Sequence, residues 1–134
     1  MDIQVRTENG SVPVTVMQVN GNLDSNSYES FEKQVSEQIE NGARYILMDF
    51  SNCKFISSAG FRALNKIFKQ LRQVHPDTNV TEADMKQGIR AGTYKSPHLK
   101  LLNLSPESRS VFEMSGFDMY LDTFSSLDTA LASF

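Results

Sequence analysis

The chain has one cysteine, scattered basic residues and no long apolar run, and each of these absences excludes a class of protein. Cys53 cannot form an internal disulfide, and no CxxC or Cys/His cluster predicts a zinc site. No apolar stretch approaches the roughly 18 residues that a membrane helix needs. The N-terminus lacks the basic start and apolar core of a signal peptide. The 13 Lys and Arg residues are dispersed, which argues against a nucleic-acid surface.

Nucleotide-binding loops are also missing, because the chain contains neither GxxxxGK[ST] nor GxGxxG. We therefore expect a soluble, cytoplasmic protein that inserts into no membrane and uses no metal or cofactor. Its 134 residues include nine Phe and are 40% hydrophobic, which is enough apolar surface for one domain spanning residues 1–134.

Three apolar patterns in the first half predict strands, and an Asn-Gly pair predicts the turn between the first two. Residues 2–6 alternate, an Asn-Gly pair within 8–11 indicates a hairpin, and residues 12–19 predict a second strand that is either buried on both faces or bulged. The run Arg44–Phe50 is almost continuously apolar. This is typical of a strand buried on both faces, as in a parallel sheet.

Helical spacing appears twice in the same half. Apolar residues recur from Tyr28 to Ile39, where Asn26 and Glu29 resemble a capping pair and Gly42 can end the helix. A second amphipathic helix is expected over Ala59–Leu71.

The pattern fades between residues 75 and 97, where only Thr81 with Asp84 suggests a short helix. Such a long loop in a compact domain is either functional or mobile. Residues 98–104 then predict a strand, and Ser105 followed by proline predicts a helix that Gly116 ends.

The last segments predict a short strand over Met119–Leu121 and a final helix opened by Ser125 with Asp128. The whole order is β-β-α-β-α-loop-β-α-β-α. It predicts an α/β fold with a mixed, largely parallel β-sheet packed with about four α-helices.

Two adjacent serines, Ser57 and Ser58, stand between the buried strand and the second predicted helix. Either hydroxyl could cap the helix, since serine is a preferred N-cap residue. A phosphate on either would also be tolerated there, because a helix N-terminus offers free amides and a positive dipole. Such a phosphate would add nearly two negative charges and oppose a docked partner.

A catalytic serine is the weaker interpretation. The nucleophile-elbow pattern GxSxG is absent, since the local order is Ile-Ser-Ser-Ala-Gly. The only histidine bases would be His75 and His98, at the two ends of the long loop. We therefore expect no enzymatic activity.

The segment ILMDFSNCKFISSAGFRAL resembles the signature of STAS domains, specifically of stand-alone bacterial anti-sigma factor antagonists. The family's Asp-Leu-Ser corresponds to Asp49–Ser51, and its apolar pair with the serine motif corresponds to Phe55–Phe61. The family's Gly-x-Leu-Asp loop is similar to Gly21–Asp24, and its C-terminal pattern is similar to residues 102–131. The resemblance covers residues 3–74 and 98–132.

The resemblance implies partner switching. The unphosphorylated antagonist would bind an anti-sigma factor that is also a serine kinase and so release that factor's client. Phosphorylation would end the complex, and a metal-dependent serine phosphatase would restore it. Alignment on the motif glycine places the phosphoacceptor at Ser58. The implied partner-binding residues are Asp24, Ser57, Ser58, Ala59, Gly60, Phe61 and Arg62.

Two departures from the family pattern leave alternatives open. Ser57 stands where many members have Asp, so the choice between Ser57 and Ser58 stays open, and residues 75–97 insert about twenty residues where most members have a short turn. A STAS domain could also be a constitutive subunit, for example of a lipid-transport complex. A small α/β enzyme that uses the serine is the third possibility.

Overall fold

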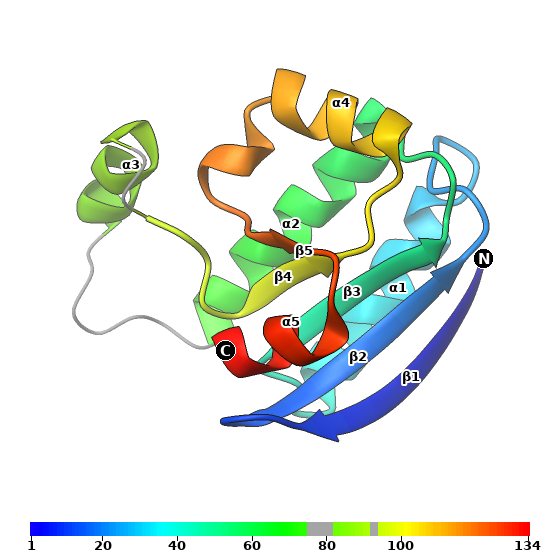
Figure 1. Cartoon of the computed structure of the whole chain (residues 1–134), viewed down its shortest axis with the longest axis horizontal. Coiled ribbons are helices and arrows are strands. Elements are labelled where there is room, and N and C mark those ends of the chain that lie inside the picture. Colours follow the sequence, from blue (N-terminus) through cyan, green and yellow to red (C-terminus); the bar gives the residue numbers. More distant parts are fainter. Residues whose placement is uncertain (75–81, 92–93) are drawn as a thin grey trace.

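The computed structural model describes residues 1–74, 82–91 and 94–134 and contains one five-stranded sheet of order β1-β2-β3-β4-β5. The strands are β1 (Asp2–Asn9), β2 (Pro13–Asn20), β3 (Ile46–Asn52), β4 (Leu99–Leu102) and β5 (Thr123–Phe124). The first two strands form an antiparallel hairpin, and every later pairing is parallel (Figure 1). The predicted mixed, largely parallel sheet is therefore confirmed.

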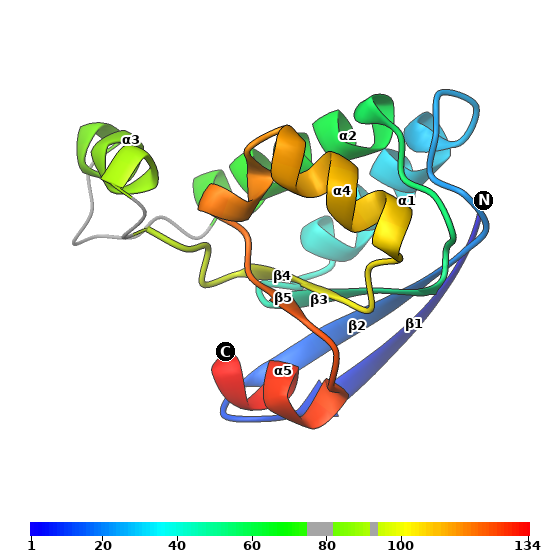
Figure 2. The ribbon, with the colours of Figure 1, turned by 45° about the horizontal axis from the view of Figure 1, so that its top comes forward.

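Helices cover both faces of this sheet unequally. The described residues form α1 (Tyr28–Glu40), α2 (Ser58–Val74), α3 (Glu82–Ala91), α4 (Pro106–Met114) and α5 (Leu127–Ser133), with a 3₁₀ helix η1 at Phe117–Met119. Helices α1, α2 and α4 lie on one face, and α5 lies on the other (Figure 2). Right-handed crossovers that always advance in one direction across the sheet place their helices on the same face.

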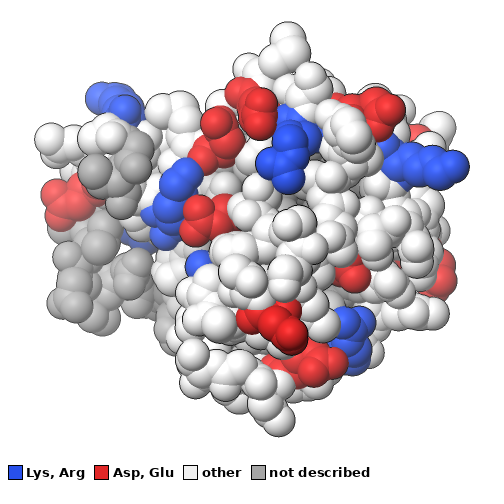
Figure 3. Space-filling view, in the orientation of Figure 1, with Lys and Arg blue, Asp and Glu red and all other residues white. Residues whose placement is uncertain are grey.

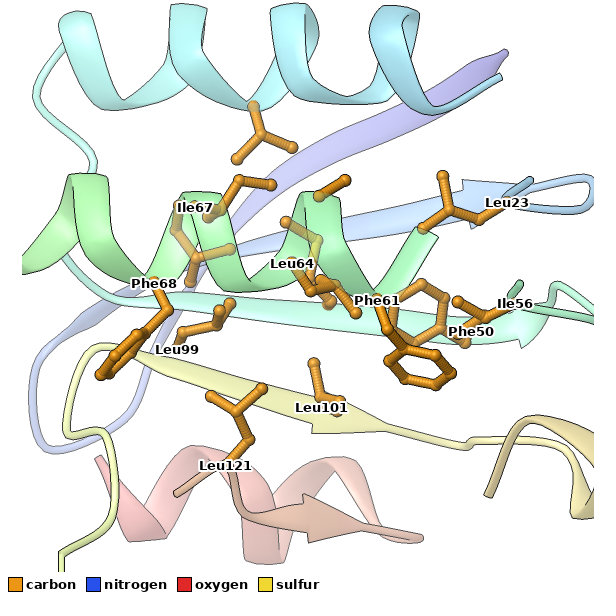
Figure 4. Close-up of a cluster of buried hydrophobic side chains, with 14 of the residues drawn as sticks. Leu23, Phe50, Ile56, Phe61, Leu64, Ile67, Phe68, Leu99, Leu101 and Leu121 are labelled. Atoms are coloured by element: carbon orange, nitrogen blue, oxygen red, sulfur yellow. The ribbon is translucent and has the colours of Figure 1, made fainter. Parts of the chain in front are cut away.

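The main core lies between the sheet and α1, α2 and α4. Phe61, Leu64 and Ile67 of α2 point toward Phe50 and Leu101 of the sheet (Figure 4). On the opposite face, Val14, Val16, Leu47 and Leu102 pack with Ala130 of α5. Strands β2 and β3 are therefore buried on both faces, which explains their nearly continuous apolar runs. The only register shift of β2 is at its end, between Gln18 and Asn20 in its pairing with β3.

Several local predictions are confirmed by the backbone. Gly42 follows α1 with φ of 109°, a conformation that glycine adopts without steric cost. Ser105 caps α4 by accepting a hydrogen bond from the Ser108 amide at 3.1 Å, with Pro106 in the first helical position.

Three local predictions are wrong. The residue before α1 is Ser27, whose hydroxyl contacts the backbone of residues 22 and 24 instead of the helix, and the Asn26 and Glu29 capping pair does not form. The predicted strand at Met119–Leu121 is displaced, because η1 occupies Phe117–Met119 and β5 begins at Thr123. The last helix is capped by Ser126 and not by Ser125.

The helix suggested within residues 75–97 is present as α3, although Thr81 lies outside the described residues. Met85 is buried, and Ile89 and Tyr94 pack against the main core. These contacts explain why part of this polar segment is ordered, because an isolated helix of this length would be marginal in water.

Lys, Arg, Asp and Glu are interspersed on the face seen in Figure 3, and neither sign forms a broad patch. No helix in the described part of the chain is long and apolar enough to cross a lipid bilayer.

Candidate functional site

Three loops meet at the edge of the sheet where the parallel strands end. The loop after β2 joins the end of β3 and the loop that follows it through three backbone hydrogen bonds, from Gly21 N to Asn52 O (3.1 Å), Leu23 N to Phe55 O (3.0 Å) and Ser57 N to Leu23 O (2.9 Å). Leu23 and Ile56 also form an isolated parallel bridge. The pairing of β2 with β3 thus continues into the loops that follow them. The last of these hydrogen bonds holds Ser57, the residue just before α2.

The loop after β4 completes this edge. Its Ser105 hydroxyl donates to the Lys54 carbonyl at 2.6 Å. The carboxylate of Asp49, in the middle of β3, accepts from the Ser51 amide at 2.9 Å and lies 3.5 Å from the Asn103 amide nitrogen. Asp49, which is only 7% exposed, therefore links β3 to the start of the loop after β4 through Asn103.

Gly60 allows α2 to approach the loop after β2 closely. A Cβ at this position would lie 2.8 Å from the Leu23 carbonyl oxygen and 2.8 Å from Cγ2 of Ile56. Real Cβ atoms essentially never come so close to another heavy atom. The motif glycine is thus required by packing, and the neighbouring Leu23, Ile56 and Phe61 are fully buried beside it (Figure 4).

The two serines have different environments. The half-buried Ser57 is the N-cap: its hydroxyl accepts from Gly60 N at 3.3 Å, and its amide is held by Leu23. Ser58 is the first residue of α2 and is exposed. Its hydroxyl has no hydrogen-bond partner within the described chain. Of these two serines, Ser58 is therefore the one that presents an unengaged hydroxyl to an approaching protein.

The remaining residues of the implied partner surface divide into exposed and buried groups. Asp24, Ala59 and Arg62 are at least partly accessible, and Asp24 follows the Leu23 that is bonded to Ser57. Gly60 and Phe61 are buried, and the Phe61 ring stacks on Phe117 with centroids 5.5 Å apart. These two residues can affect a partner only indirectly, by fixing the start of α2.

Phe55 is a surface residue that the sequence analysis did not single out. Its side chain is 41% exposed, whereas the adjacent Ile56 is fully buried. Its exposure could have been predicted because side chains alternate along an extended segment. Ile56 pairs with Leu23 and faces inward, so the neighbouring Phe55 faces outward. An exposed aromatic ring three residues before Ser58 is a typical anchor for a protein partner.

A shallow groove between α1 and α2 begins beside the same helix start. One hollow of about 550 Å³ is lined by Tyr28, Ala59 and Arg62, among others, and a second of about 240 Å³ continues along the helices. Lys66 and Glu32 line both and form an ion pair at 3.3 Å. The groove is open and has a mixed polar and apolar lining, and its shape suits a protein surface better than an enclosed small molecule.

Among the described residues, no histidine lies close enough to Ser58 to act as the base of a serine hydrolase. His98 is buried just before β4, whose first residue pairs with Ile46 at the start of β3. Ser58 follows the other end of β3, about 20 Å away for a strand of this length. The Nδ1 atom of His98 lies 3.1 Å from the Arg44 carbonyl oxygen. His98 is therefore a residue of the opposite edge, and His75 lies outside the described residues.

Cys53 lies under this site and is 2% exposed. Burial raises the pKa of its thiol above the ordinary value, and Asp24 acts in the same direction, while hydrogen bonds with Leu23 and Phe55 oppose the shift. We expect alkylation of Cys53 by iodoacetamide at pH 8 to be at least about tenfold slower in the native protein than in urea, because the thiolate is the reactive form. Equal rates would show that the loop opens readily.

Comparisons with known proteins agree with this architecture. The STAS domain model matches residues 2–77. A proposed anti-sigma factor antagonist of Bordetella bronchiseptica, BtrV, is 31% identical over 114 residues, which cover 85% of this chain and 80% of that protein. The chain therefore belongs to the STAS domain family.

Solved structures show the same fold. The crystal structure of an anti-sigma factor antagonist from Mycobacterium paratuberculosis superposes with a TM-score of 0.69 at 18% identity, covering 98% of this chain and 93% of that one. The Bacillus cell fate determinant SpoIIAA in its phosphorylated form gives a TM-score of 0.60 at 21% identity, with 96% of both chains covered.

Proposed function

We propose that this protein is an anti-sigma factor antagonist whose binding to its partner ends when Ser58 is phosphorylated. The observation that carries the proposal is the exposed, unengaged hydroxyl of Ser58 at the first position of α2, where two strand-end loops converge. The likeness to BtrV, a proposed antagonist, supports the class of partner. SpoIIAA has a phosphorylated form on the same fold, which supports the mode of control.

The physical effect of the phosphate would be opposite on the two sides of the interface. Within this chain, the free amides and the dipole of α2 would accept the charge, and the first turn of α2 contains no acidic residue to oppose it. A partner docked over Phe55 and Ser58 would instead meet close to two negative charges that it did not accommodate before. The modification would therefore leave the fold intact and remove the complex.

The proposed partners follow from this control. One is an anti-sigma factor with serine kinase activity, and the other is a metal-dependent serine phosphatase that regenerates the free hydroxyl. Both would act in the cytoplasm, with this protein as a non-enzymatic regulator. The surface that they contact would consist of Asp24, Phe55, Ser58, Ala59 and Arg62, with Ser57, Gly60 and Phe61 holding it in place.

Phosphopeptide mapping tests the proposal directly. The protein is isolated from the cells that make it, with phosphatase inhibitors, and analysed by mass spectrometry beside Ser57→Ala and Ser58→Ala. We expect one phosphate in wild type and Ser57→Ala, and none in Ser58→Ala. Phosphate on Ser57 would reassign the acceptor. Absence of phosphate from both serines, together with stable co-purification with a membrane transport complex, would favour a constitutive subunit instead.

A further inference from the structure

We propose that Arg62 binds the phosphate on Ser58, so that phosphorylation withdraws from the partner surface a guanidinium that the unmodified protein offers to an acidic group. This inference rests on the proposed function, because it concerns the same serine. It goes beyond the proposed function because it assigns a role in the control of partner binding to a second residue of this chain.

The placement of Arg62 carries the inference. It follows Ser58 by four residues in α2, and both side chains are exposed. Side chains four apart on a helix are neighbours, with Cβ atoms about 5–6 Å apart. Helical side chains also lean toward the N-terminus, so the long side chain of Arg62 can reach the turn that contains Ser58. A guanidinium there can bind two phosphate oxygens at once.

Arg62 is also uncommitted in the unmodified protein. Its guanidinium makes no hydrogen bond or ion pair within the described residues, although it lines the same hollow as Glu32. Glu32 is instead engaged by Lys66 at 3.3 Å. An unpaired arginine at the border of the proposed interface is therefore available to a carboxylate of the partner.

The charged groups near the first turn of α2 determine how the unmodified and the phosphorylated protein differ toward a partner. The groups on the surrounding elements are Asp24 after β2, Lys54 after β3, Glu29 and Glu32 on α1, Arg62 and Lys66 on α2, and Glu107 and Arg109 on α4. With Lys66 paired to Glu32 and Lys69 about 16 Å farther along the helix, Arg62 is the cation on α2 that a phosphate on Ser58 would recruit. The partner would then lose an attractive contact in addition to facing new negative charge.

The test uses protein with phosphoserine encoded genetically at position 58, so that no kinase is needed. The second pKa of the phosphate is measured by ³¹P NMR in wild type, Arg62→Gln and Lys69→Gln. Lys69 is an exposed residue of α2 with no partner in the described chain, and it begins about 16 Å farther along the helix than Ser58. Its substitution therefore removes one positive charge, as Arg62→Gln does, but at more than a Debye length from the phosphate.

We expect Arg62→Gln to raise the phosphate pKa by roughly 0.3 or more, because Arg62 favours the dianion, and Lys69→Gln to change it by less than about 0.1. The difference should shrink in 1 M NaCl. Equal pKa values for the two variants would overturn the inference. Because the phosphoserine is encoded genetically and needs no kinase, that failure is distinguishable from an absence of Ser58 phosphorylation in cells, which would overturn the proposed function alone.

Discussion

Ser58→Asp should bind the anti-sigma factor at least about tenfold more weakly than wild type, whereas Ser58→Ala should bind with nearly unchanged affinity. The hydroxyl makes no hydrogen bond inside the described chain, so its removal costs the free protein little. A carboxylate at the same position adds negative charge to a surface that must be desolvated on binding, and each 1.4 kcal/mol of repulsion is a factor of ten.

Isothermal titration calorimetry with the purified partner measures this effect. The matched control is Ser11→Asp, which places the same charge on the exposed β1–β2 turn at the opposite end of β2. It should leave the affinity within about twofold of wild type, since the two sites lie more than a Debye length apart. If Ser58→Asp and Ser58→Ala bind equally well, control by charge at this position is wrong.

Gly60→Ala should destabilise the protein by about 2–3 kcal/mol, although alanine is the better helix former by nearly 1 kcal/mol. The reason is steric: the added methyl would lie 2.8 Å from the Leu23 carbonyl oxygen, which is backbone and is itself bonded to the Ser57 amide. Relief of the overlap requires the loop that carries Asp24 to move away from α2. Partner binding should therefore weaken together with stability.

Urea unfolding followed by circular dichroism gives the stability change. The control is Ala59→Gly, which makes the reverse substitution at the preceding, half-buried position and should cost at most about 1 kcal/mol through helix propensity. A Gly60→Ala protein that is as stable as wild type would mean that α2 and the loop separate without cost. A stable variant that still loses binding would place the effect on the interface alone.

The parts of the fold that could be read from sequence are those with strong local periodicity. The apolar run that became β3, the amphipathic pattern of α2 and the Ser-Pro start of α4 all appear where expected. Each is determined by the burial of its own residues, so neighbouring residues in the chain contain the signal. The order of the elements then predicted the parallel sheet.

The parts that could not be read depend on contacts between distant residues. Asn26 and Glu29 have the spacing of a capping pair, but the loop of residues 22–24 directs the Ser27 hydroxyl elsewhere. Near the C-terminus, Phe117 stacks on Phe61, and the segment Phe117–Met119 forms a 3₁₀ turn. Strand β5 therefore begins only at Thr123. Short strands have too few residues for their periodicity to compete with such contacts.

The sequence by itself determined that a serine pair stands where a buried strand passes into a helix, and that this junction belongs to a recognisable pattern. Only the tertiary structure separated the two hydroxyls. Leu23, more than thirty residues earlier in the chain, holds the Ser57 amide and so makes Ser57 the cap of α2. Ser58 is then left exposed, as are Phe55 three residues before it and Arg62 four residues after it. The physical reason is that hydrogen bonds from residues distant in the chain determine which of two adjacent hydroxyls remains free to contact another protein.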